Sequence, residues 1–158
     1  GRVDWGAILA QQGGNEDRND LICRIIQSQP QRTFLVLVKR VEQGHYLLNK
    51  LKEGGESITN LIGSQQEFDA EARILIGTCQ KVGVGFDHPR LDTLLLATDI
   101  EEYFIQYLGR VFRRKDSNPM IFDLVDNNPI LLRHFKTRQK IYKECGGEIT
   151  TPNLENYL

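Results

Sequence analysis

Cysteine, histidine and long apolar runs are scarce in this sequence of 158 residues, and each scarcity excludes a class of protein. The cysteines are odd in number and form no C-x-x-C pair, which excludes a disulfide framework and a zinc cage; they are Cys23, Cys79 and Cys145. The histidines lack the spacing of ligands, so no metal site is predicted. No window approaches the roughly 18 apolar residues that span a bilayer. We expect reduced thiols, no membrane contact and an intracellular, cytoplasmic or nuclear, location.

An excess of charge of either sign is also lacking. Lys and Arg number 20 against 21 Asp and Glu, for a net charge of −1. This balance excludes a uniformly basic nucleic-acid binder but leaves room for local basic patches. The content of 40% hydrophobic and 26% charged residues is typical of a globular domain, and the length suits one core.

The phosphate-binding motifs of nucleotide enzymes are absent. No Gly-Lys dipeptide occurs, which excludes the P-loop G-x-x-x-x-G-K-[ST]. Gly83-Val-Gly85 lacks the third glycine of a dinucleotide fingerprint, and Ser64 lacks the G-x-S-x-G context of a hydrolase nucleophile. Met120 to Asp123 resembles an apolar strand that ends in a magnesium-binding Asp, but without a P-loop a plain strand end is favoured.

Short apolar runs alternate with amphipathic segments along the chain. The runs predict strands at 34–38, 57–62, 74–76, 93–97 and 120–125. The amphipathic segments predict helices from about 21 to 28 and at 42–52, 66–72, 101–112 and 129–145. Such alternation indicates βαβ units. We therefore predict the α/β fold class: a three-layer sandwich with a mainly parallel sheet covered on both faces.

A cationic segment late in this pattern reads Gln106-Tyr-Leu-Gly109-Arg110-Val-Phe-Arg113-Arg114. It resembles motif VI of the superfamily 2 helicases, Q/H-R-x-G-R-x-x-R, with Tyr107 in place of the first Arg. Two arginines three apart on a helix share one face, where both guanidinium groups can reach one polyphosphate. Such arginines stabilise the charge that develops on a transferring phosphoryl group.

Two earlier segments resemble motifs of the same superfamily in the expected order. Residues 34–40, an apolar strand ending in Lys39-Arg40, look like motif IV. Residues 74–87 look like motif V, an apolar strand that ends at Thr78 before a loop with Gly85 and Asp87. By this resemblance Thr78 would hydrogen-bond a backbone phosphate. Gly85 and Asp87 would approach the ribose of ATP or the motifs of a first domain.

The resemblance implies a C-terminal RecA-like (P-loop NTPase-like) domain, without a P-loop, at residues 30–150. A helical lead-in at 1–29 would precede it and a tail at 151–158 would follow. ATP and Mg²⁺ would be held mainly by an N-terminal RecA-like domain of the full-length chain. Arg110 and Arg113 would reach the β- and γ-phosphates, and Gln106 would help to orient the group that senses the γ-phosphate. We expect this chain alone not to hydrolyse ATP.

A track for nucleic acid is predicted along one edge of the sheet. The carboxyl ends of parallel strands share an edge, so residues distant in sequence would converge there; they are Lys39, Arg40, Gly63, Ser64, Thr78 and Lys81. Contacts to phosphates alone make binding sequence-tolerant and sensitive to salt. The rival basic surface is the final helix, whose cations we interpret as a solvated face; they are Arg133, Lys136, Lys140 and Lys143.

The first residues, Val3-Asp-Trp5 and Asn15 to Ile25, resemble the lead-in of DNA-repair and poxvirus-type transcription helicases. This favours DNA over RNA and admits a viral source. The function implied is ATP-driven translocation or unwinding. Two alternatives stay open: an α/β module that only binds nucleic acid or protein, with degenerate motifs, and a stand-alone nucleotide-binding enzyme of the doubly wound class. A P-loop and a DExx segment upstream in the full-length chain would favour the helicase.

Overall fold

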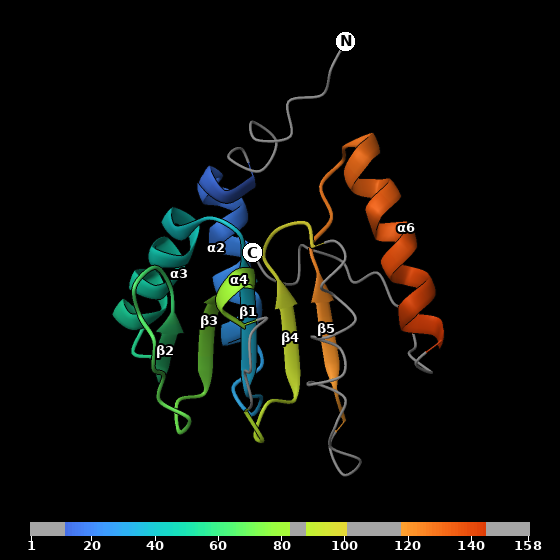
Figure 1. Cartoon of the computed structure of the whole chain (residues 1–158). Helices are drawn as coiled ribbons and strands as arrows, with labels where there is room; N and C mark the ends of the chain where they lie inside the picture. The colour runs from blue at the N-terminus through green and yellow to red at the C-terminus, as the bar shows by residue number, and fades with distance from the viewer. Residues whose placement is uncertain (1–11, 83–87, 101–117, 145–158) are drawn as a thin grey trace.

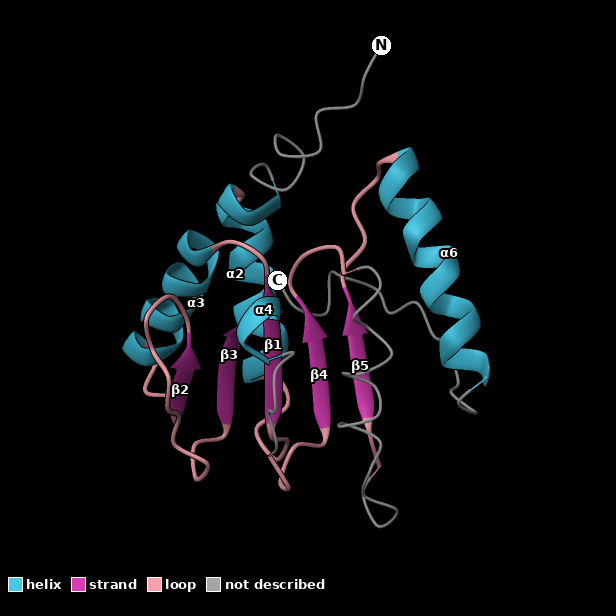
Figure 2. Ribbon diagram, in the orientation of Figure 1, coloured by secondary structure: helices cyan, strands magenta, loops and turns pink. Residues whose placement is uncertain are grey.

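The computed structural model describes residues 12–82, 88–100 and 118–144. Within them, a five-stranded sheet has the order β2-β3-β1-β4-β5, and every neighbouring pair is parallel (Figures 1 and 2). The strands are β1 Phe34–Val38, β2 Ile58–Leu61, β3 Ile74–Thr78, β4 Thr93–Leu96 and β5 Met120–Asp123. The predicted α/β class with a parallel sheet is confirmed.

Helices cover both faces of this sheet. Helices α2 (Glu16–Gln27) and α3 (Val41–Glu53) pack on one face, against a core that includes Phe34 and Val36 of β1. Helix α6 (Pro129–Glu144) and the single turn α4 (Cys79–Val82) pack on the other, where Leu35 and Leu37 point. Successive β1 residues thus enter opposite cores, and all five are buried. Each such side chain contributes roughly 1.5–3 kcal/mol when fully buried.

The helix ends follow local chemistry. The Asn15 side chain caps α2 by accepting a hydrogen bond from the Arg18 amide at 3.1 Å. Asn128 caps α6 in the same way, through the amides of Ile130 and Leu131, and Pro129 occupies the first helical position. Cys23 of α2 is buried, and burial raises the pKa of its thiol to about 11, which leaves the thiol unreactive at neutral pH.

Most predicted elements lie within a few residues of the observed ones, but two differ. The helix predicted at 66–72 is wrong: this stretch is a loop. The Asp69 amide donates to Thr59 Oγ1 at 2.9 Å, and the Asp69 carboxylate accepts from the Glu71 amide, so local side-chain bonds replace a helical ladder. The turn α4 was not predicted, because four residues are too few to show a periodic pattern. The helix predicted at 101–112 lies outside the described residues.

Candidate functional site at the carboxyl edge of the sheet

Three adjacent strands end side by side on the edge where the nucleic-acid track was predicted. Val38 of β1 pairs with Thr78 of β3, and Leu61 of β2 pairs with Gly77. The residues that follow therefore emerge together, and the structure brings Lys39, Gly63 and Thr78 to one edge (Figure 1). Thr78 retains only 8% exposure, whereas Gly63 and Ser64 are exposed.

The Gly63-Ser64 turn presents its backbone to solvent. Gly63 has φ +60°, a left-handed conformation that L side chains rarely adopt. No atom lies within 4 Å of the position that a Cβ would take there, so this side of the turn is open. The Gln65 amide donates to the Ile62 carbonyl at 3.1 Å and closes the turn. A ligand can approach this backbone without a side chain in its way.

Lys81 connects two of these strand ends. It belongs to α4, and its Nζ donates to the Gln65 carbonyl at 2.6 Å, so the turn after β2 is tied to the turn after β3. Gly77 lets α4 fold back over β3, because a Cβ at Gly77 would lie 2.5 Å from Val82 Cγ2. The lysine charge is thereby fixed at the edge, beside Gly63 and Ser64.

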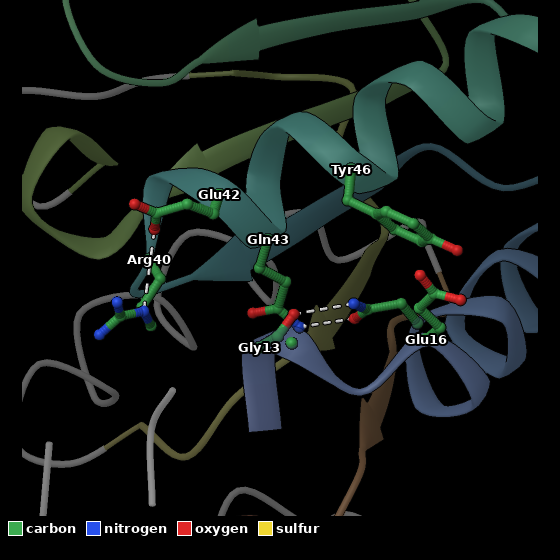
Figure 3. A pocket seen from close by; sticks show the side chains of 8 residues that line it. Gly13, Glu16, Arg40, Glu42, Gln43 and Tyr46 are labelled. Carbon is green, nitrogen blue, oxygen red and sulfur yellow. Dashed lines mark hydrogen bonds and ion pairs between the residues drawn. The ribbon is translucent and has the colours of Figure 1, made fainter. Parts of the chain in front are cut away.

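A pocket of about 330 Å³ opens beside Arg40, between the beginnings of α2 and α3 (Figure 3). Its lining residues are Gly13, Gly14, Glu16, Asn19, Arg40, Glu42, Gln43 and Tyr46. Arg40 and Glu42 form an exposed ion pair at 3.8 Å. Exposed pairs contribute little free energy, so the Arg40 guanidinium can exchange Glu42 for a phosphate at small cost.

The ends of β4 and β5 are closed instead by a buried ionic network. Arg138 of α6 donates to Asp99 at 2.7 Å, to Asp123 at 2.7 and 3.0 Å, and to the Ile100 carbonyl at 3.1 Å. Tyr142 donates to Asp123 at 2.5 Å, and His134 Nδ1 lies 2.6 Å from Asp99. Burial alone would lower the pKa of Arg138, but hydrogen bonds and the charges of Asp123 and Asp99 raise it above its ordinary value.

A second buried arginine reaches the same region from α2. Arg18 is 8% exposed; it pairs with Asp126 at 3.0 Å and donates to the Leu124 carbonyl at 3.2 Å. It also donates to the Ala97 carbonyl, just after β4. Gln12 adds a hydrogen bond to Asp126 at 2.6 Å. The segments that follow β4 and β5 are therefore joined from both faces of the sheet.

Five predicted site residues lie outside the described residues, so their positions are not part of this geometry; they are Gly85, Asp87, Gln106, Arg110 and Arg113. The Asp123 carboxylate, for which a magnesium role was the less favoured interpretation, is occupied by Arg138 and Tyr142.

Within the described ranges, no three His, Cys, Asp or Glu side chains gather as they would around a metal ion. No helix among the described residues is long and apolar enough to span a membrane.

Sequence reasoning missed the roles of Arg18, Asp99 and Arg138. A signal was present for Arg138, which lies four residues before the buried Tyr142 and three after Phe135, on the apolar side of α6. A buried arginine at such a position needs carboxylates as partners. Asp99 follows one apolar run of the sequence, and Asp123 ends another. The cations Arg133, Lys136, Lys140 and Lys143 are all exposed, which agrees with the interpretation of a solvated face.

Several viral proteins are similar to this chain in sequence. Putative helicase 161L of Invertebrate iridescent virus 6 is 46% identical over 174 residues, which cover 98% of this chain and 39% of that protein. Putative helicase 055L of Frog virus 3 (isolate Goorha) is 32% identical over 94% of this chain and 34% of that protein. Uncharacterized protein 108L of Invertebrate iridescent virus 3 is 59% identical over 63% of this chain and 95% of that protein. The chain thus spans less than half of either putative helicase. No family model matches it.

Solved structures share its fold at low sequence identity. T4 UvsW superposes with a TM-score of 0.76 at 17% identity, over 98% of this chain and 38% of that one. The C-terminal domain of the DEAD-box protein Dbp5 has a TM-score of 0.65 at 19% identity, over 84% of this chain and 80% of that one. S. cerevisiae Dbp5 bound to RNA and ADP BeF3 has a TM-score of 0.60 at 18% identity, over 86% of this chain and 38% of that one.

Proposed function

We propose that this chain is the C-terminal RecA-like domain of a superfamily 2 helicase, and that it is the strand-holding and arginine-supplying half of an ATP-driven DNA helicase or translocase. The domain proper would comprise residues 30–150, with a lead-in at 1–29 and a tail at 151–158. ATP and Mg²⁺ would lie in a cleft shared with an N-terminal RecA-like domain. That domain would hold them mainly, since this chain has no P-loop.

The observation that carries the proposal is the convergence of β1, β2 and β3 at one carboxyl edge. Their ends carry exposed glycine backbone at Gly63, the largely buried Thr78 and the half-buried Lys39 and Lys81. Amides, hydroxyls and cations along a line are what a phosphodiester backbone requires, and none of them reads a base. We expect sequence-tolerant binding on this edge, in keeping with the RNA bound by the Dbp5 structure.

The arginine-supplying role belongs to the segment between β4 and β5. Arg110 and Arg113 would reach the β- and γ-phosphates, Gln106 would assist them, and Gly85 with Asp87 would border the ribose. Closure of the two domains on ATP and their opening after hydrolysis would shift one grip on the strand relative to the other. DNA is the substrate we favour, from the character of the lead-in. A module that only binds nucleic acid or protein is the alternative.

The test uses the full-length protein and the isolated chain in parallel. We expect nucleic-acid-stimulated ATPase activity and unwinding of tailed DNA duplexes by the full-length protein, and no hydrolysis by this chain alone. Duplexes with 3′ or 5′ tails, made of DNA or RNA, would give polarity and substrate. Turnover by the isolated chain, or strand binding without any ATPase activity in the full-length protein, would refute the proposal and favour the binding module in the second case.

A further inference from the structure

The pocket between the beginnings of α2 and α3 has a buried amide oxygen in its wall. Gln43 is 1% exposed, and its Nε2 donates to Asn19 Oδ1 at 3.0 Å and to the Ala97 carbonyl at 3.2 Å. Asn19 Nδ2 in turn donates to the Gly13 carbonyl at 2.8 Å, so the orientation of both amides is determined. Among the described residues, Gln43 Oε1 has no hydrogen-bond donor. A buried acceptor without a donor is costly, so a ligand that donates to this atom gains free energy.

Glycine leaves space in front of this oxygen. A Cβ at Gly13 would lie 3.6 Å from Gln43 Oε1 and 3.7 Å from Arg40 Cδ, so both atoms border the same space. Figure 3 likewise shows Gln43 Oε1 on the side of Arg40. The Arg40 side chain is 44% exposed and held by its ion pair with Glu42 at 3.8 Å, a weak contact that leaves it able to move aside. A ligand can therefore reach Oε1 between the glycine and Arg40.

Carboxylates flank the buried acceptor. Glu16 and Glu42 both line the pocket as exposed side chains, and Figure 3 shows them on opposite sides of Gln43. The Tyr46 hydroxyl donates to Asp20 Oδ1 at 3.0 Å, so this hydroxyl proton is already used. Burial, the hydrogen bond and charge of Asp20, and the charge of Glu16 together raise the pKa of Tyr46 to about 12. The side chains that remain for a ligand are thus mainly acceptors, and negative charge predominates among them.

We propose that this pocket binds the guanidinium group of an arginine that a protein partner presents. Gln43 Oε1 accepts one N–H at the wall, and the carboxylates of Glu16 and Glu42 attract the charge at the mouth. A guanidinium suits this arrangement because its five donors lie in one plane and can serve an amide oxygen and a carboxylate together, whereas an ammonium is a point charge. The site is additional to the proposed function and does not rest on it.

Other ligand classes fit the same groups less well. A nucleobase also carries N–H donors, but it is neutral, and the phosphates attached to it would be repelled by Glu16 and Glu42. An anion would find one cationic side chain among the lining residues, Arg40, against these two carboxylates. The charge of the lining side chains therefore favours a cation that carries several donors.

Binding of N-acetyl-arginine amide to the full-length protein, followed by saturation-transfer NMR at constant ionic strength, tests the pocket. The neutral N-acetyl-citrulline amide has nearly the same shape and should bind about ten-fold more weakly, because its hydrogen bonds to the carboxylates lack the charge. Free arginine should also bind more weakly, because its α-carboxylate approaches Glu16 and Glu42. Tighter binding of free arginine would assign the pocket to a small metabolite, and binding of 2′-deoxycytidine in place of the capped arginine would assign it to a nucleobase. Either result would overturn the inference.

Two neighbouring glycines provide matched variants. Gly13→Ala places a methyl group 3.6 Å from Gln43 Oε1, in ordinary contact with the wall, and should weaken binding of the capped arginine by about ten-fold. Gly14 also lines the pocket, but a Cβ there meets no atom within 4 Å, so Gly14→Ala should keep the affinity within about two-fold. Neither glycine has a positive φ, and both variants should keep the wild-type Tm. Glu16→Gln and Glu42→Gln should each weaken binding. Equal affinities of Gly13→Ala and Gly14→Ala, or unchanged affinity in both Gln variants, would refute the site.

Discussion

The two halves of the carboxyl edge are built in opposite ways. At the ends of β1, β2 and β3, the Gly63-Ser64 turn is exposed, and half-buried Lys81 donates to the carbonyl of Gln65. At the ends of β4 and β5, Arg18 and Arg138 are buried among carboxylates and carbonyls. The difference teaches that one half of this edge is left open to a ligand, whereas the other half is cross-linked within the chain. Four substitution tests can break or sharpen this contrast.

The largest effect is expected for the two arginines that the proposed function assigns to ATP. Arg110→Ala and Arg113→Ala in the full-length protein should each reduce kcat for ATP hydrolysis by roughly a thousand-fold or more, because under this proposal a positive charge is lost where phosphoryl charge develops. Nucleic-acid affinity should change far less, and Lys115→Ala should leave both nearly unchanged. Steady-state ATPase assays measure kcat, and strand-binding titrations measure the affinity for nucleic acid. A variant that kept its ATPase activity while losing affinity for the strand would show that the arginine contacts nucleic acid and not ATP.

Stability should differ between the halves as well. Arg138→Met removes the cation from buried Asp99 and Asp123, which keep only His134 and Tyr142, and should cost about 3–5 kcal/mol in the free energy of unfolding. Ser64→Ala, in the exposed turn after β2, should change that free energy by less than about 1 kcal/mol. Urea unfolding of this chain, followed by circular dichroism, gives both values. Equal costs would mean that the two halves are equally cross-linked.

The strand grip predicts a difference in salt dependence. Replacing Lys39, Arg40 and Lys81 together by Gln should flatten the slope of log affinity against log salt by up to about two, since each lost single-strand contact removes about 0.7. Replacing the exposed α6 cations Lys136 and Lys140 should leave the slope unchanged. Binding of single strands by the full-length protein, titrated at a series of salt concentrations, measures this slope. The reverse result would place the track on α6.

The smallest effect concerns the turn after β2. Gly63→Ala should cost about 1 kcal/mol of stability, because a Cβ is strained at φ +60° although it meets no atom. Gly55→Ala is a matched control, with φ +82°, the same open space and a position away from the carboxyl edge. Both variants should be destabilised alike, but only Gly63→Ala should weaken strand binding. Equal affinities in the two variants would remove Gly63 from the grip.

The sequence was sufficient to predict most of the sheet because its three central strands, β3, β1 and β4, are buried along their whole length. The runs Phe34 to Val38 and Ile74 to Ile76 are continuously apolar and too short for a helix, so they indicate buried strands. The order β2-β3-β1-β4-β5 was not predicted, since periodicity reports burial and not which strands are neighbours. The helix predicted at 66–72 was wrong because Asp69 and Thr59, ten residues apart, prefer a hydrogen bond that no local pattern reveals.

The convergence of the candidate site residues was predictable where it depends on strand ends. Lys39, Gly63 and Thr78 follow or end three apolar strands, and a parallel sheet brings such positions together. The buried arginine networks at the ends of β4 and β5 were not predictable, because Arg18 and Asp126 are 108 residues apart in sequence and meet only through the fold. An exposed arginine and a buried one look alike in a polar stretch of sequence. Only the packing of α2 and α6 distinguishes them.

The position of β3 between β1 and β2 has a consequence for synthesis on the ribosome. A nascent chain that has emerged only as far as Arg73 contains two strands that are not neighbours, so neither can pair with the other. Their apolar faces and open hydrogen-bonding edges are then exposed to other chains. Emergence of the five residues of β3 supplies a partner to both strands at once. Emergence of that short stretch therefore covers one hydrogen-bonding edge of each strand, and the other edge of β1 stays open until β4 emerges.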